Sequence, residues 1–113
     1  MSPLARAVYR ILRLRVSLPD PRIKYGELAE QLRDTADHFE HIYPRSRELY
    51  AALVEVGQEC RRQGRPPLPA LVVRADTRRP GAAYGAQLAT RGLRIAAWRA
   101  DLEAVKRTTY PRR

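Results

Sequence analysis

The chain has 113 residues, enough for one hydrophobic core, and 44% of them are hydrophobic, so we expect a single folded domain over residues 1–113. No apolar run approaches the roughly 20 residues of a membrane span and no signal-peptide pattern opens the sequence, so a cytoplasmic protein is expected, without membrane contact. One cysteine, Cys60, excludes an internal disulfide.

The net charge of +10 belongs to the second half of the chain. Residues 1–59 carry nine basic and nine acidic side chains, whereas residues 60–113 carry 13 basic and three acidic ones. Twenty of the 22 basic residues are arginine, whose planar guanidinium suits bidentate contacts to phosphate or guanine. A GC-rich genome would explain arginine in place of lysine, but explains the uneven placement less well. The charge predicts a polyanionic partner, with nucleic acid first.

Two helices are predicted before the polar residues 33–42, which are expected to form a loop or a partial turn of helix. The first covers residues 3–16, with Ser2 as its N-cap. The second begins at residue 25 or 26 and ends near residue 32, after a short extended segment at Ile23.

The longest predicted helix covers residues 44–63, with Gly64 as a favourable residue just beyond its end. Its apolar stripe consists of Leu49, Leu53, Val56 and Cys60, widened by Tyr50 and Val54. No histidine is close to Cys60 in the sequence, so we expect its thiol to pack in the core and not to act as a nucleophile.

The segment from Pro66 to Gly81 holds the clearest β signal. Residues 70–73 are a continuous apolar run between prolines and turn-forming residues. We expect a buried strand there that leads into a basic hairpin tip, a wing, with a short second wing strand at 82–84.

A last helix is predicted over residues 90–107. Its apolar seam, at spacings of three, four and three, consists of Ile95, Trp98, Leu102 and Val105. This seam serves either the core or a dimer contact. Residues 108–113 form a basic tail that is expected to be mobile unless Tyr110 packs, which leaves a core of about residues 3–107.

This order of elements is that of a winged helix-turn-helix domain with an added C-terminal helix, a mainly α fold with a small β-hairpin. In such domains the third helix presents its N-terminal end to the major groove, and the wing contacts the backbone or the minor groove. Duplex DNA is therefore the expected partner of a transcriptional regulator or DNA-targeting subunit. The residues expected to contact it are Arg45, Ser46, Arg47, Arg74, Thr77, Arg78, Arg79, Arg91 and Arg94.

Two stretches resemble known families. Residues 24–29, Lys-Tyr-Gly-Glu-Leu-Ala, resemble the segment that opens the helix-turn-helix part of alkyltransferase-like DNA-binding domains. The Pro-Cys-His-Arg motif of that family is absent, so the resemblance does not imply alkyl transfer. Residues 60–81 resemble a family of small uncharacterised bacterial winged-helix-like proteins, which end the motif with Gly-x-Gly-Phe where this chain has Gly-Ala-Ala-Tyr at 81–84. Both resemblances imply a winged-helix fold.

The main alternative is a protein-interaction module, whose basic face docks an acidic partner or which forms a homodimer through its last helix. The one cluster with metal-ligand chemistry is Asp34, Asp37, His38, Glu40 and His41. Its spacing matches no closed zinc pattern, so no metal is expected. The sequence contains no phosphate-binding glycine loop, serine elbow or paired-carboxylate signature, so we expect no cofactor and no enzymatic activity.

Overall fold

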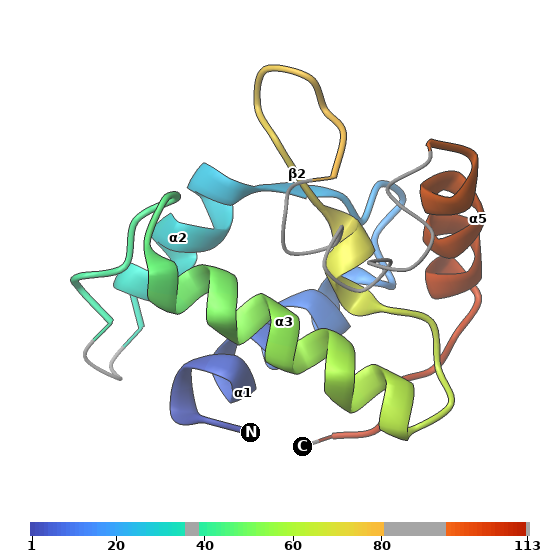
Figure 1. The fold of residues 1–113 in the computed structure, drawn as a ribbon, viewed down its shortest axis with the longest axis horizontal. Helices are drawn as coiled ribbons and strands as arrows, with labels where there is room; N and C mark the ends of the chain where they lie inside the picture. Colours follow the sequence, from blue (N-terminus) through green and yellow to red (C-terminus); the bar gives the residue numbers. More distant parts are fainter. Residues whose placement is uncertain (36–38, 81–94, 113) are drawn as a thin grey trace.

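The computed structural model of the chain describes residues 1–35, 39–80 and 95–112, with side chains from Ala97 onward in the last segment. The elements in chain order are α1 (Pro3–Arg15), β1 (Ile23–Lys24), α2 (Tyr25–Arg33), α3 (Arg47–Arg62), the 3₁₀ turn η1 (Leu68–Leu71), β2 (Val72–Val73) and α5 (Ile95–Lys106). Within these residues the fold is a mainly α domain of four α-helices and one two-stranded sheet (Figure 1).

α1 packs against α3, and the core lies between them and the segment η1–β2. α1 has the predicted start, because the Ser2 hydroxyl accepts a hydrogen bond from the Ala5 N–H at 3.1 Å. In α3 the predicted stripe is confirmed, since all four of its members are fully buried. Tyr50 does not widen this stripe: it is 44% exposed, because it lies about 100° around the helix from Leu49.

α3 begins three residues later than predicted, at Arg47. The Ser46 backbone is extended, its hydroxyl accepts from the Tyr43 N–H at 2.8 Å, and its own N–H donates to the Tyr43 carbonyl at 3.0 Å. These two bonds close a turn over residues 43–46. Arg45 therefore lies before the helix and not in its first turn.

The end of α3 is as predicted. Gly64 has a φ of +68°, the left-handed conformation that a residue without a Cβ adopts readily. Its N–H donates to the Arg61 carbonyl, and the Arg65 N–H donates to the Cys60 carbonyl. This Schellman arrangement satisfies carbonyls that the helix itself leaves unpaired.

The sheet differs from the predicted hairpin. Its strands are parallel, with Ile23 paired to Val72 and Lys24 to Val73, so the partner of β2 precedes α2. Beyond β2 an antiparallel bridge joins Val73 to Pro80. The predicted second wing strand at 82–84 lies outside the described residues.

The predicted strand at residues 70–73 is confirmed only in its second half. Its first two residues belong to the 3₁₀ turn η1, where the Ala70 N–H donates to the Pro67 carbonyl at 3.1 Å. Pro69, inside this turn, has no N–H to give to a strand partner. The extended backbone therefore begins only at Val72.

α5 packs on η1, and three residues of the predicted seam are buried core residues: Trp98, Leu102 and Val105. The Trp98 Nε1–H donates to the Ala70 carbonyl at 2.8 Å, so the buried indole has a partner. The side chain of Ile95 and the predicted first turns of this helix lie outside the described part of the chain.

The core extends beyond its predicted limit, because the C-terminal segment is docked. Tyr110 is 3% exposed, and its hydroxyl donates to the Pro66 carbonyl. The Tyr9 hydroxyl donates to the Pro111 carbonyl at 2.7 Å, and the Arg13 Nε donates to the Tyr110 carbonyl at 2.8 Å. The segment that follows α5 is thereby held against α1 and against the loop that follows α3.

We predict that Tyr110→Ala lowers the free energy of unfolding by about 3–5 kcal/mol, as expected for the loss of a buried aromatic ring. Tyr110→Phe keeps the ring and loses only the hydroxyl, at a cost of about 1 kcal/mol. Urea denaturation at pH 7 measures both costs. Equal stability of the two variants and the wild type would show that the segment is not docked.

The same variants should respond differently to alkaline pH. Burial raises the pKa of the Tyr110 hydroxyl, so above the ordinary tyrosine value of about 10 only the unfolded chain releases this proton. The stabilisation is complete below about pH 10 and is lost as the pH rises further. The stability difference between the wild type and Tyr110→Phe should therefore shrink above about pH 10.

Candidate nucleic-acid interface

The predicted wing tip is an exposed loop, residues 74–79, which we call the basic loop. Two backbone hydrogen bonds close it: the Arg74 N–H donates to the Arg79 carbonyl at 2.9 Å, and the Arg78 N–H donates to the Arg74 carbonyl at 2.8 Å. β2, directly before it, is buried and paired with β1. Figure 1 shows the loop projecting beyond the helices at the top of the view. The loop thus presents its side chains from a base anchored in the core.

The three arginines of the basic loop are not equivalent. The Arg74 guanidinium donates two hydrogen bonds, of 3.1 and 3.0 Å, to the Asp76 carboxylate. This pairing raises the pKa of Arg74 and lowers the pKa of Asp76. Within the part of the chain that the structure describes, Arg78 and Arg79 form no ion pair. The loop therefore offers Arg78 and Arg79 to an anionic partner more readily than Arg74.

Arg78 has an unusual backbone conformation, with a φ of +55°. The left-handed region costs a residue with a Cβ about 1–2 kcal/mol, and glycine or asparagine is the usual choice there. Arg78 is exposed, so packing does not explain an arginine at this position. Strained residues of this kind gather at functional sites, which favours a contact role for its side chain.

Two further polar residues lie in or beside the basic loop: Thr77 within it and Lys24 at its base. The Thr77 Oγ1 accepts a hydrogen bond from the Arg79 N–H at 3.3 Å, which leaves its hydroxyl proton available to a phosphate oxygen. Lys24 is placed beside Val73 at the base of the loop by the parallel pairing. Sequence reasoning missed Lys24, because the two strands are far apart along the chain.

The start of α3 forms a second exposed basic surface. Arg45 and Arg47 are both exposed, one in the turn before the helix and one as its first residue, with Ser46 between them. Tyr50, one turn further along, is exposed beside Arg47 and adds an aromatic side chain that the sequence had placed in the core. Tyr43, on the other side of this turn, is 58% exposed.

The ring of Tyr43 is held in place by a cation–π contact, because the Arg33 guanidinium carbon lies 4.7 Å from its centroid. Arginines and exposed tyrosines together provide charge for phosphate and flat apolar surface for sugars and bases. The hydroxyl of Ser46 already accepts from the Tyr43 N–H, so it contributes to the shape of this surface.

Several of the residues singled out in the sequence lie outside the described part of the chain. Arg91 and Arg94 lie outside the described residues. So do Asp37 and His38, and among the described residues no group of three or more His, Cys, Asp or Glu could hold a metal ion. Cys60 is fully buried, and burial raises its pKa to about 11, so the thiol is protonated at neutral pH. No described helix is long and apolar enough to cross a membrane.

Comparisons of the chain with protein-family models, curated proteins and solved structures found no match. The two resemblances noted in the sequence therefore stay predictions.

We predict that Arg78→Asn leaves the free energy of unfolding unchanged or raises it by up to about 1 kcal/mol, because asparagine tolerates the left-handed region better. Thermal or urea unfolding measures the change. Arg79→Asn is the matched control, since Arg79 is also exposed but has no positive φ, and it should bring no gain. A clear loss of stability in Arg78→Asn alone would contradict the strain assigned to this position.

Proposed function

We propose that this protein binds duplex DNA in the manner of a winged helix, as a transcriptional regulator or a DNA-targeting subunit. The observation that carries the proposal is the basic loop, exposed throughout, closed by its own backbone hydrogen bonds and anchored on a buried strand. It belongs to the half of the chain that carries the whole net charge of +10. In this proposal the loop takes the place of the hairpin wing.

The two surfaces would contribute differently to binding. Arg78 and Arg79 would contact phosphates, or enter a narrow minor groove, and so supply affinity for any duplex. Arg45 and Arg47 would approach base edges in the major groove, where arginine makes bidentate contacts to guanine. Any sequence preference would therefore arise at the start of α3 and not in the loop.

Support for the alternatives is weaker. Because three residues of the α5 seam are buried inside the domain, we do not propose dimerisation through that seam. An acidic protein docked on the basic loop would use the same arginines as DNA. A duplex is favoured because its phosphates form a continuous row that can engage Arg78 and Arg79 together.

Removing the charges of Arg78 and Arg79 in the basic loop tests the proposal. Arg78→Asn combined with Arg79→Gln should weaken binding to all duplex sequences about equally, and should reduce the slope of log K against log salt by up to about 2. Electrophoretic mobility shifts with duplex DNA, single-stranded DNA and RNA across salt concentrations measure both effects and show which nucleic acid is preferred.

The matched control for this variant is Arg61→Gln with Arg112→Gln. Both arginines are exposed, and the charge removed is the same. Arg61 lies in the last turn of α3 and Arg112 next to the C-terminus, and Figure 1 shows both of these chain segments at the bottom of the view, away from the loop. This control should keep most of the affinity. Equal losses in the two double variants, or no binding to any duplex, would overturn the proposal.

Removing the internal partner of Arg74 should have the opposite effect. Asp76→Asn keeps an oxygen for the Thr77 N–H, which now donates to the Asp76 carboxylate at 2.8 Å, but frees Arg74 for phosphate. Affinity for duplex DNA should rise several-fold at low salt, with a slope larger by up to about 1. Glu103→Gln is the control, because it frees Lys106 on α5 by the same change in charge. A gain of equal size in both variants would point to net charge instead of the loop.

A further inference from the structure

Tyr43 places an aromatic ring on the surface from a fixed stretch of backbone. It is 58% exposed, although it directly follows the fully buried Ile42. Its N–H donates to the Ser46 hydroxyl at 2.8 Å, and its carbonyl accepts from the Ser46 N–H at 3.0 Å. The turn before α3 therefore carries an exposed ring that the packing of the core does not require.

Arg33, the last residue of α2, holds the Tyr43 ring from one side. Its guanidinium carbon lies 4.7 Å from the ring centroid, and its Nη1 donates to the Ile42 carbonyl at 2.8 Å. The guanidinium is thus tied to a segment that is anchored in the core. Because the contact orients the ring before any ligand arrives, a ligand on the ring would bind at a lower cost in entropy.

The charges around this ring are basic. Residues 41–47 contain Arg45 and Arg47 and no acidic residue, and both arginines are exposed. Among residues 1–35, 39–80 and 95–112, neither forms an ion pair. An arginine in the first turn of a helix opposes the helix dipole, so local stability does not account for Arg47. An aromatic ring beside such cations matches a nucleotide, which combines a flat base with an anionic phosphate.

α2 connects this surface to the basic loop. It begins directly after Lys24, which pairs with Val73 at the base of the loop, and it ends at Arg33 beside Tyr43. Its nine residues span about 13 Å, the length of about four base steps of a nucleic acid. Figure 1 shows α2 running from the foot of the loop toward the left side of the view. One nucleic-acid molecule can therefore reach both surfaces.

We propose that Tyr43 stacks on an unpaired nucleobase, so that the preferred ligand is a duplex interrupted by a few unpaired nucleotides. The inference rests on the proposed function, because the basic loop supplies the contact to the duplex. In an intact duplex the faces of the bases are stacked on one another, so an exposed ring can stack only on a base that is unpaired. A cationic ligand fits less well, because Arg33 already occupies one side of the ring and the nearby charges are positive.

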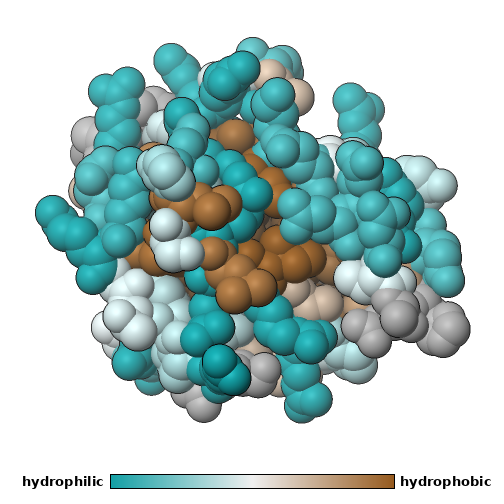
Figure 2. All heavy atoms as spheres, turned by 180° about the vertical axis from the view of Figure 1, so that it is seen from behind, coloured by the Kyte–Doolittle hydropathy of each residue, from teal (hydrophilic) through white to brown (hydrophobic). Residues whose placement is uncertain are grey.

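The opposite side of the molecule offers a binding partner less. α1 lies behind α3 in Figure 1, and Figure 2 shows hydrophobic atoms gathered in the middle of this rear face. On α1, however, Leu4 and Ile11 pack against the core, so this surface is largely the margin of the core.

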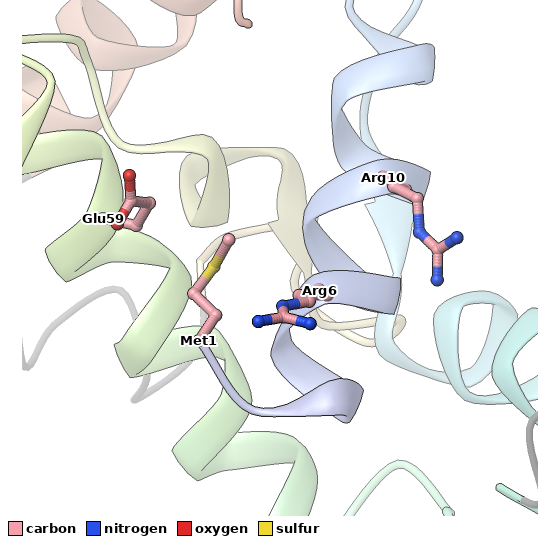
Figure 3. Close-up of a pocket in the computed structure, with 4 residues that line it drawn as sticks. All are labelled: Met1, Arg6, Arg10 and Glu59. Atoms are coloured by element: carbon pink, nitrogen blue, oxygen red, sulfur yellow. The ribbon is translucent and has the colours of Figure 1, made fainter. Parts of the chain in front are cut away.

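A pocket between α1 and α3 is likewise occupied with contacts inside the chain. It is open, has a volume of about 520 Å³ and is lined by Met1, Arg6, Arg10 and Glu59 (Figure 3). Glu59 accepts hydrogen bonds from Arg62 and Gln63, and Arg10 also interacts within the chain. The pocket therefore carries no proposal.

The test compares an intact duplex with the same duplex in which one strand lacks about four nucleotides, so that the thymidines opposite the gap are unpaired. Fluorescence polarisation should show that the wild type binds the gapped duplex about tenfold more tightly. Tyr43→Leu should abolish this preference and leave the affinity for the intact duplex unchanged. Tyr43→Phe keeps the ring and should keep the preference.

A second measurement detects the stacking itself. With 2-aminopurine among the unpaired bases, stacking on the tyrosine ring should quench its fluorescence when the wild type binds. Tyr43→Leu at saturating concentration should leave the fluorescence high. A variant that had only lost stability would still quench the probe once the folded protein saturated the DNA.

Tyr50→Leu is the matched control. Tyr50 is also an exposed tyrosine near the start of α3, but in the described chain no cation–π contact holds its ring. This variant should keep most of the preference for the gapped duplex. Thermal unfolding of both leucine variants should stay close to that of the wild type, because both rings are largely exposed.

Several results would overturn the stacking: equal affinity of the wild type for the two duplexes, a preference that survives Tyr43→Leu, or an equal loss in Tyr50→Leu. If the wild type binds neither duplex, the proposed function fails instead. Single-stranded oligothymidine then decides about Tyr43. Binding that Tyr43→Leu weakens and Tyr50→Leu does not would uphold the stacking, and any other result would end it.

Discussion

The parallel pairing of β1 with β2 is the contact on which the candidate interface depends. Each strand is only two residues long, so the pairing by itself contributes little. It is held because Ile23, Val72 and Val73 are buried, with 1%, 1% and 4% of their surfaces exposed. The same contact sets the start of α2 against the base of the basic loop. Burial of three apolar side chains thus positions an exposed and highly charged segment.

A second set of contacts keeps the two ends of the described chain together. On α1, Tyr9 donates a hydrogen bond to the Pro111 carbonyl and Arg13 donates one to the Tyr110 carbonyl. The Tyr110 hydroxyl donates to the Pro66 carbonyl. These bonds satisfy polar groups that would otherwise be buried without partners. They involve the same helix whose Ala5, Val8 and Leu12 lie in the core, whereas its Leu14 is 66% exposed.

Much of the helical structure follows from local patterns. Ser2 caps α1, Gly64 ends α3, and the periodic apolar residues of α3 are buried as expected. The sequence predictions were wrong at Tyr50 and at the start of α3, where the local residue pattern was compatible with two structures. Tyr50 has an apolar ring and a polar hydroxyl, and its place at the margin of the stripe left it exposed. At Ser46 the hydroxyl closed the preceding turn, which moved the start of α3 and left Arg45 outside the helix.

The sequence by itself determined the helical elements, the apolar stripe of α3 and the uneven distribution of charge, because caps, periodicity and composition depend on near neighbours. Only the tertiary structure decided that β2 pairs with β1 and that Asp76 forms an ion pair with Arg74. It also decided that Tyr110 is buried with its hydroxyl bonded to Pro66, and that Leu14 on α1 stays exposed. Periodicity shows that a face is apolar, but what covers that face depends on segments that meet from distant parts of the chain. The candidate site could therefore be predicted as a set of arginines, whereas their relative availability to a partner depends on contacts that form only in the folded chain.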